Sequence, residues 1–315
     1  MLLTDYFYPD PDAAWDFAVL SGVKHGVIRL PEKDFDPASL SQMRAVYDRF
    51  AAYGIKPVII EPMPNALHDE IKAGSRKRDE AIEKVIGMMA AMDKLDLRTI
   101  CFNFMAHIGW TRTSSSIPAR GGAKVTGFSL NDFHENTKPI THEALWQNYE
   151  YFLKAVLPYA EKYGIRLALH PDDPPLEKLG NTARIFTSAD AFRKAMAQVP
   201  SDNLGITFCQ ANFVLMGEDP YQLIPEWKSK IFFVHFRNVE GKKESFHETF
   251  HDEGAIDMAK ILRCYYENGV DVPIRVDHVP SYPFGDSQKT AGYGAVGRLF
   301  AIGYLKGLME AIEHD

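Results

Sequence analysis

Four residues that commonly bind metal ions stand at or just after the ends of short apolar segments. The segments read LALHPDDPP, LGITFCQ, FFVHFRN and IRVDHVP, and the residues are His170, Cys209, His235 and Asp277. Imidazole, thiolate and carboxylate groups together suit a divalent transition metal. A single histidine at a strand end is more often a hydrogen-bonded structural residue, and a single cysteine is more often a small buried apolar group. The repetition at four successive segments nevertheless favours a metal site.

Four protein ligands limit what such a metal could do. They would complete a tetrahedral zinc site, which is typical of structural zinc. Mn²⁺ and Fe²⁺ accept five or six ligands and leave room for substrate oxygens, and the thiolate of Cys209 favours Fe²⁺ over Mn²⁺. If the site is catalytic, we therefore expect Mn²⁺ or Fe²⁺.

Two further residues are candidates for proton transfer beside the metal. His278 directly follows Asp277, and strand alternation would point it away from its neighbour unless the strand has ended there. Tyr293 stands between two glycines in AGYGAVGR, where the backbone and a substrate can approach each other closely. An imidazole and a phenol in such positions suit general acid–base chemistry.

A second set of polar residues is predicted to contact the substrate. Arg112 and Arg237 could each bind a carboxylate through two parallel hydrogen bonds, although a surface salt bridge is the alternative for either. His251 and Asp252 lie in FHDEG, where helix capping by Asp252 or Asp257 is equally reasonable. The full set of expected substrate contacts is Asn103, Arg112, Arg237, Asn238, His251 and Asp252.

Other residues capable of chemistry are expected to have supporting roles. Asp172 and Asp173 directly follow His170, and one of them is expected to orient its imidazole. The histidines interpreted as surface or structural residues are His25, His68, His107, His134 and His142.

The apolar pattern predicts the strands that must bring these residues together. The segments PVII, ICFNF, RLALH and IFFVHF are continuously apolar, as in parallel strands that are covered on both faces. Longer stretches with helical spacing separate them. The eight predicted strands are Leu2–Phe7, Val23–Leu30, Lys56–Glu61, Arg98–Asn103, Arg166–His170, Asn203–Phe208, Ile231–Phe236 and Pro273–Asp277.

The intervening helices have recognisable ends. Asp36 is predicted to cap a helix that has Pro37 at its first position. Thr141 is predicted to begin a long helix that ends at Gly164, and Ser188 is predicted to cap another. Two more helices are predicted over Asp79–Leu95 and Arg298–Ile312.

Strand–helix alternation repeated eight times predicts a (β/α)8 TIM barrel that forms a single domain over residues 1–315. A doubly wound open sheet is the competing arrangement, but no GxGxxG motif follows the first strand. In a barrel, neighbouring strands end around one mouth, so the four metal-ligating candidates would converge. Residues 104–140 form an unusually long, Ser- and Gly-rich connection at this catalytic face, which predicts a lid or substrate loop.

Composition and charge exclude several function classes. The 35 Lys and Arg against 42 Asp and Glu give a net charge of −7, which argues against a nucleic-acid or anionic-membrane partner. No apolar stretch approaches the roughly 18 residues of a membrane helix, and the segment MLLTDYFYPDPD does not resemble a signal peptide. The 3 cysteines are widely spaced without a CxxC motif, so we expect a cytoplasmic protein. We also expect a homo-oligomer, a dimer or larger.

Several motifs occur in the order of a known enzyme family. They are ICFNFM, WTRT, LHPDDPP, GITFCQ, FVHFRNV, FHDEGAIDM and GYGAVGR, and with the segments between them they cover most of the chain from Ile100 to Leu308. In these motifs the chain resembles the mannonate dehydratases, which are related to xylose-isomerase-like sugar enzymes. The resemblance implies a TIM barrel and a Mn²⁺- or Fe²⁺-dependent elimination of water from a sugar acid. In the family, D-mannonate becomes 2-keto-3-deoxy-D-gluconate during hexuronate degradation.

The resemblance also implies roles for individual residues. The hydrogen at C2 of a sugar acid is only weakly acidic, so a cation must stabilise the developing charge beside the carboxylate. A neutral tyrosine or histidine must handle the protons of C2 and of the departing hydroxyl. By motif, the metal ligands are His170, Cys209, His235 and Asp277, and the catalytic pair is His278 and Tyr293.

The sequence departs from the family pattern at the walls of the predicted pocket. It reads Arg-Val-Asp-His-Val-Pro over residues 275–280, where RPDHG is expected, and the chain and its 104–140 segment are shorter than in typical members. The alternative function is therefore a metal-dependent sugar isomerase, epimerase or keto-sugar lyase on the same barrel. A non-catalytic binding barrel would not need an acid–base pair. A cationic pocket for the carboxylate would favour the dehydratase, and its candidates are Arg112, Arg237 and Arg275.

Overall fold

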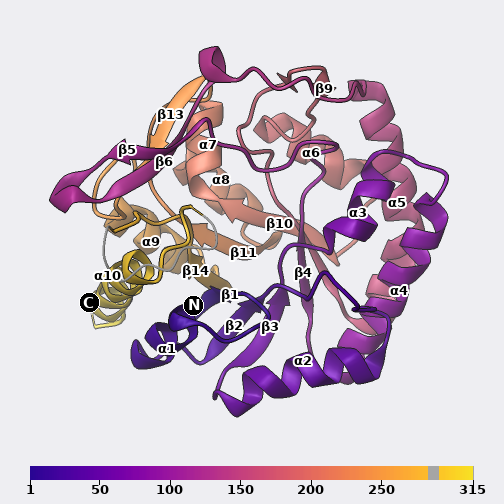
Figure 1. Cartoon of the computed structure of the whole chain (residues 1–315), viewed down its shortest axis with the longest axis horizontal. Helices are drawn as coiled ribbons and strands as arrows, with labels where there is room; N and C mark the ends of the chain where they lie inside the picture. Colours follow the sequence, from indigo (N-terminus) through magenta and orange to yellow (C-terminus); the bar gives the residue numbers. More distant parts are fainter. Residues whose placement is uncertain (283–290, 315) are drawn as a thin grey trace.

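Eight parallel strands form a closed barrel at the centre of this protein (Figure 1). The computed structural model describes residues 1–282 and 291–314. Around the barrel the strand order is β1-β14-β11-β10-β7-β4-β3-β2, so each strand lies beside its sequence neighbours in the barrel. The strands are β1 (Leu2–Phe7), β2 (His25–Ile28), β3 (Lys56–Ile60), β4 (Thr99–Phe102), β7 (Arg166–Leu169), β10 (Leu204–Cys209), β11 (Ile231–Phe236) and β14 (Pro273–Val276).

The predicted TIM barrel is therefore confirmed. Strand β1 pairs in parallel with both β2 and β14, which closes the sheet and excludes the open doubly wound alternative. All eight barrel strands fall within one or two residues of the predicted ranges or inside them. Within the described residues, no helix has both the length and the apolar character needed to cross a bilayer.

Side-chain alternation divides each barrel strand between two cores. Tyr6 and Val27 point into the barrel, while the next residues, Phe7 and Ile28, belong to the larger core between strands and helices. Because of this alternation, small and aromatic side chains fill the barrel interior below the carboxyl ends of the strands. The buried residues of this inner cluster are Tyr6, Val27, Ile59, Cys101, Ala168, Phe232 and Phe233.

The helices surround the barrel, and most of their predicted ends are confirmed. Thr141 and Ser188 cap α5 and α6 through bonds to the backbone N–H of Ala144 and Ala191, and Gly164 ends α5 with φ of 63°. The helices are α1 (Ala13–Leu20), α2 (Leu40–Ala52), α3 (Asn65–Lys72), α4 (Arg78–Lys94), α5 (His142–Tyr163), α6 (Ala189–Gln198), α7 (Gln210–Met216), α8 (Pro220–Trp227), α9 (Met258–Glu267) and α10 (Ala295–Glu313).

One predicted cap is wrong. Helix α2 begins at Leu40 and is capped by Ser39, whose hydroxyl accepts from the backbone N–H of Gln42. Asp36 instead accepts from the backbone N–H of Ala38 at 3.1 Å. Both residues are of capping type, and the local turn around Pro37 places the helix start at the second of them.

A second sheet extends the barrel at the carboxyl ends of its strands (Figure 1). It is antiparallel, with the order β12-β13-β6-β5, and β12 follows β11 after only Arg237 and Asn238. Its strands are β5 (Ser114–Pro118), β6 (Lys124–Ser129), β12 (Val239–Lys242) and β13 (Ser245–Glu248). The 104–140 connection thus contains two strands, and it pairs with a hairpin that is far away in sequence. A lid role for this segment stays a prediction.

Candidate active site and metal centre

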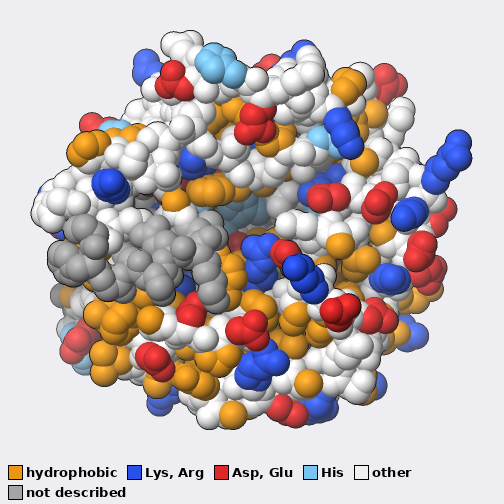
Figure 2. Space-filling model, viewed as in Figure 1, with side chains coloured by type: hydrophobic (Ala, Val, Ile, Leu, Met, Phe, Trp, Pro, Cys, Tyr) orange, Lys and Arg blue, Asp and Glu red, His pale blue; other side chains and the backbone are white. Residues whose placement is uncertain are grey.

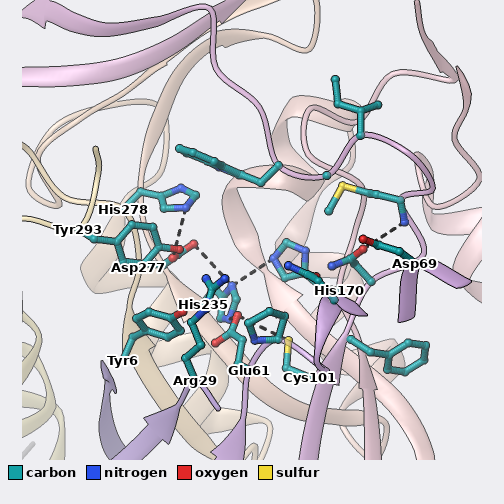
Figure 3. Close-up of a pocket in the computed structure, with 18 of the residues that line it drawn as sticks. Tyr6, Arg29, Glu61, Asp69, Cys101, His170, His235, Asp277, His278 and Tyr293 are labelled. Carbon is teal, nitrogen blue, oxygen red and sulfur yellow. Dashed lines mark hydrogen bonds and ion pairs between the residues drawn. The ribbon is translucent and has the colours of Figure 1, made fainter. Parts of the chain in front are cut away.

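A cavity of about 360 Å³ opens where the barrel strands end (Figures 2 and 3). Acidic, basic and aromatic side chains line it, which suits a small polar ligand. The wall includes residues from the ends of β1, β2, β3, β4, β7, β11 and β14. The predicted site residues that line this cavity are Asn103, His170, His235, Asp277, His278 and Tyr293.

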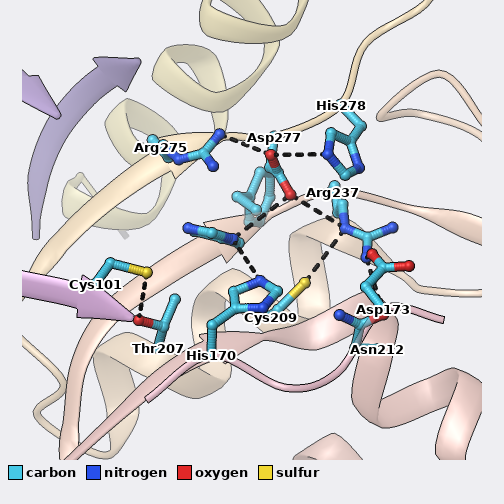
Figure 4. A network of polar contacts seen from close by, with 12 residues as sticks. Cys101, His170, Asp173, Thr207, Cys209, Asn212, Arg237, Arg275, Asp277 and His278 are labelled. Carbon is cyan, nitrogen blue, oxygen red and sulfur yellow. Dashed lines mark hydrogen bonds and ion pairs between the residues drawn. The ribbon is translucent and has the colours of Figure 1, made fainter. Parts of the chain in front are cut away.

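Three of the predicted metal ligands converge beside the cavity (Figure 4). One ligand atom each from His170, Cys209 and His235 lie within 4.8 Å of one another. His170 Nε2 is 3.1 Å from His235 Nδ1, and Asp277 Oδ2 is 3.5 Å from that same nitrogen. Two ligand atoms that each lie about 2.1 Å from the same ion, and form a right angle at it, are about 3 Å apart. The spacing of these side chains therefore fits a shared cation. The donor set of two imidazoles, a thiolate and a carboxylate therefore fits a transition metal.

Buried arginines neutralise the acidic members of this group. Burial would raise the pKa of Asp277, but the charges of Arg275 and the neighbouring histidines and Arg237 hold it well below the usual range. Arg275 contacts Asp277 Oδ1 at 2.7 Å, and Arg237 Nε contacts Oδ2 at 3.2 Å. The same Nε donates to Cys209 Sγ at 3.3 Å. Burial lowers the pKa of His170 and so favours its neutral, ligating form.

A second acid reaches the centre from the opposite side. Glu61 Oε1 lies 3.1 Å from His235 Nε2, and Cys101 Sγ lies 3.6 Å from the same oxygen. Arg275 binds both oxygens of Glu61 at 3.0 and 3.1 Å, so this carboxylate stays ionised and its pKa is lowered despite burial. The sequence analysis did not select Glu61. It ends the third predicted strand, and the strand-end pattern that marked His170 would also have marked it.

The backbone turns sharply after Asp277, and this turn places His278 at the cavity. Strand β14 ends at Val276, and His278 has a left-handed φ of 35°. Asp277 and His278 can therefore both line the cavity although they are adjacent in sequence. His278 Nδ1 lies 2.6 Å from Glu248 Oε1, and charges from His278 and Arg112 lower the Glu248 pKa to about 2 against the effect of burial. An ionised Glu248 can only accept a hydrogen bond, so Nδ1 donates to it, and Nε2 lies 3.6 Å from Asp277 Oδ1.

Tyr293 lies beside His278 and lines the cavity, where its side chain is half-buried. Its ring centroid is 5.3 Å from that of His278 and 5.3 Å from that of Tyr6. Burial and the charge of Asp277 raise the pKa of Tyr293 well above its usual value. The neutral phenol is therefore the form that this site favours, and it can donate a proton.

The predicted carboxylate clamps, Arg112 and Arg237, lie outside the cavity wall and already have buried partners. Arg112 binds Asp173 through two bonds of 2.6 and 3.0 Å and also contacts Glu248. Arg237 contacts Asp173 at 2.8 Å and Glu248 at 3.2 Å. Either Asp172 or Asp173 was expected to orient His170, but the Asp173 carboxylate binds these arginines and that of Asp172 accepts from the Ile185 and Phe186 backbone. His170 is oriented through its Nδ1, which lies 2.6 Å from the Pro171 carbonyl oxygen.

Three other predicted substrate contacts also lie away from the cavity wall. The Asn238 side chain donates to the Ile256 carbonyl and accepts from the Val239 and Ile256 backbone, so it holds a loop. His251 is buried against the Phe236 carbonyl at 2.8 Å. Asp252 pairs with Arg120 on the surface. Asp257, the other capping candidate, caps α9.

Besides Glu61, several cavity residues were not selected from the sequence, because they stand singly in loops, helices or strands without a motif that sets them apart. His107 was interpreted as surface or structural; it is exposed, as expected, and it also lines the cavity at a left-handed φ of 60°. His68 fits its structural interpretation, since it is buried among aromatic rings. The unselected ionisable or aromatic residues of the wall include Tyr6, Tyr8, Arg29, Glu61, Asp69, Lys72, Cys101, His107 and Trp110.

Comparison with known proteins identifies the family. The family described as D-mannonate dehydratase (UxuA) matches this chain over residues 20–138 and 129–315. This chain belongs to the mannonate dehydratase family. Its relatives include the mannonate dehydratase of Streptococcus equi subsp. zooepidemicus, which is 30% identical over 91% of this chain and 92% of the relative. The mannonate dehydratase of Oceanobacillus iheyensis is 31% identical over 82% of each chain.

Solved structures agree with this membership. The mannonate dehydratase of Streptococcus suis serotype 2 superimposes with a TM-score of 0.87 and 27% identity, covering 100% of this chain and 94% of that one. An L-ribulose 3-epimerase superimposes with a TM-score of 0.61 at 14% identity, covering 98% and 95% of the two chains. At that identity the epimerase shows a shared barrel fold and carries no functional argument. Both the sequence comparison and the structural comparison therefore support the membership of this chain in the mannonate dehydratase family.

Proposed function

We propose that this protein is a metal-dependent sugar-acid dehydratase that converts D-mannonate into 2-keto-3-deoxy-D-gluconate. The observation that carries this proposal is one cavity, in a member of the mannonate dehydratase family, that holds the metal-ligating group beside His278 and Tyr293. The substrate partner is accordingly a small sugar acid. A cytoplasmic location and a homo-oligomeric state remain predictions for cell fractionation and light scattering to test.

The residues proposed to hold the metal are His170, Cys209, His235 and Asp277. Their donor types and spacing fit a transition metal, and Mn²⁺ or Fe²⁺, which accept five or six ligands, would leave room for substrate oxygens. When bound, such a cation would stabilise negative charge that develops beside the substrate carboxylate. Glu61 and Arg275 support this group from beneath by fixing the positions of His235 and Asp277.

The acid and base roles follow from the surroundings of His278 and Tyr293. We assign the base role to the imidazole of His278, which lines the cavity with Nδ1 2.6 Å from Glu248 Oε1 and Nε2 3.6 Å from Asp277 Oδ1; in its neutral form it accepts the proton from C2 of the substrate. Tyr293 stays neutral and donates its proton to the C3 hydroxyl, which leaves as water. The electron pair of the C2–H bond forms the C2–C3 double bond. The resulting enol tautomerises to the 2-keto-3-deoxy acid.

Anaerobic turnover of D-mannonate with Mn²⁺ or Fe²⁺ tests this proposal directly. We expect a 2-keto-3-deoxy acid to form, and to form only with one of these metals present. Chelation should stop the reaction, and added metal should restore it. Isomerisation or epimerisation of a neutral sugar, without dehydration of any sugar acid, would overturn the proposal in favour of the alternative function.

A further inference from the structure

The cations that line the cavity differ in how firmly they are paired. Arg275 is buried and binds both oxygens of Glu61 and one of Asp277. Withdrawing Arg275 would leave two largely buried carboxylates without their main counter-charge, so it is poorly suited to bind an incoming anion. Lys72 is also buried, and its Nζ lies 2.8 Å from Asp69, whose side chain is 62% exposed. Burial lowers the pKa of Lys72 and so disfavours its charged form, and an ammonium lacks the planar fork that matches a carboxylate. Lys72 is therefore also poorly suited to bind a carboxylate.

Arg29 differs from Arg275 in its partner, and it differs from Lys72 in its guanidinium group and in its side-chain exposure of 29% against 3%. It directly follows β2 and lines the cavity on the side of Tyr6 and Glu61 (Figure 3). Within the described part of the chain, the carboxylate that contacts its guanidinium is that of Glu32, and the Glu32 side chain is 64% exposed. An exposed ion pair contributes little free energy, so a ligand can replace Glu32 at small cost.

The position of Arg29 relates it to the reacting groups. Its guanidinium interacts with the Tyr6 hydroxyl, and the Tyr6 ring lies 5.3 Å from that of Tyr293. One aromatic side chain therefore separates Arg29 from the proposed proton donor. In a sugar acid the carboxylate carbon is bonded to C2, where the proton is removed, so a carboxylate anchor is required close to the acid–base pair.

We propose that Arg29 binds the carboxylate of the sugar-acid substrate and displaces Glu32 when it does so, an inference that rests on the proposed function. A planar guanidinium matches a carboxylate through two parallel hydrogen bonds. The Arg29 side chain is 29% exposed, so it is accessible from the cavity yet partly shielded from water. Arg29 thus selects acids over neutral sugars, the role for which Arg112 and Arg237 were predicted from the sequence.

Binding of a charged and a neutral ligand to the same protein tests this inference. Calorimetry on the Mn²⁺-loaded protein would compare D-mannonate with D-mannitol, both measured in a Tyr293→Phe background that prevents turnover. We expect Arg29→Met to weaken D-mannonate binding about 10- to 100-fold and to leave D-mannitol binding within about twofold. Arg29→Lys should recover part of the loss, because it keeps the charge without the planar fork.

Two matched variants separate the alternatives. Glu32→Gln removes the competing carboxylate and should leave D-mannonate binding equal or tighter. Lys72→Met should reduce it less than Arg29→Met does. Unchanged D-mannonate binding in Arg29→Met, an equal loss for D-mannitol, or a larger loss in Lys72→Met would overturn the inference.

The outcome is independent of whether the proposed reaction is correct. If the native protein does not dehydrate D-mannonate but prefers it to D-mannitol through Arg29, the proposed function fails and the anchor stands. If the native protein dehydrates D-mannonate and Arg29→Met keeps the full preference, the anchor fails and the function stands.

Discussion

Glu248 Oε1 lies 2.6 Å from His278 Nδ1, although Glu248 belongs to the antiparallel sheet and His278 follows a strand of the barrel. Glu248 ends β13 of the antiparallel sheet, and His278 follows the last barrel strand. Thr126, on β6, donates to the other oxygen of Glu248 at 2.8 Å. The antiparallel sheet therefore supplies the acid that orients the imidazole, which gives the 104–140 segment a supporting function in the site.

Replacing Glu248 with glutamine is expected to reduce kcat about 10- to 100-fold, the usual effect of losing an outer partner of a site residue. The amide can still contact Nδ1, but it no longer favours the protonated nitrogen there. Metal content should stay unchanged, as measured by atomic emission after dialysis. Thr126→Val, which removes only the bond to the other oxygen, should have a smaller effect. An equal kcat for Glu248→Gln and the native protein would contradict the orienting role.

Tyr293→Phe should lower kcat by about 10²- to 10⁴-fold, because a positioned general acid contributes that much. Metal content and substrate affinity should change little, since the phenol lies beside the metal group and the ring is retained. Steady-state kinetics and metal analysis would measure both. Tyr159→Phe on the exposed face of α5 is the control and should behave as the native protein. Full kcat in Tyr293→Phe would show that this tyrosine only lines the pocket.

Cys209→Ser is expected to weaken metal binding sharply while the barrel stays folded, because one soft ligand is lost from an otherwise intact group. Metal retained after dialysis and circular dichroism would be measured together. Cys264→Ser is the matched control, since this cysteine lies on α9 at the half-buried outer surface. Equal metal retention in the two variants would mean that Cys209 is a core residue without a ligand role.

His251 should make the fold less stable as the pH falls. Burial lowers its pKa to about 4 in the native state, whereas an unfolded histidine titrates near 6.5. Between these values the unfolded chain binds a proton that the folded protein does not, so the free energy of unfolding decreases from about pH 6.5 down to about pH 4. This residue should account for a loss of about 3 kcal/mol at most.

Urea unfolding of the native protein and of His251→Gln at several pH values would measure this contribution. Glutamine can still donate to the Phe236 carbonyl that His251 Nε2 contacts. The pH dependence of the variant should be shallower over this range. Parallel curves for the two proteins would show that His251 is not a source of acid sensitivity.

Much of the barrel could be predicted because its signals are local. Continuously apolar runs such as IFFVHF indicate strands buried on both faces, and the caps Thr141 and Ser188 mark helix starts. The antiparallel sheet was missed because β5 and β6 are short and polar, and β6 finds its partner β13 far along the chain. Pairing over such a separation leaves no periodic pattern in either segment.

The sequence by itself determined the barrel and the group of residues at its strand ends, since strand alternation and parallel order bring His170, His235 and Asp277 to one mouth. Only the tertiary structure decided which charged residues remain available there. Arg112 and Arg29 are both arginines after strands, but one is paired with buried acids and the other with exposed Glu32. That difference depends on burial and on distant partners, which residue type and spacing do not encode.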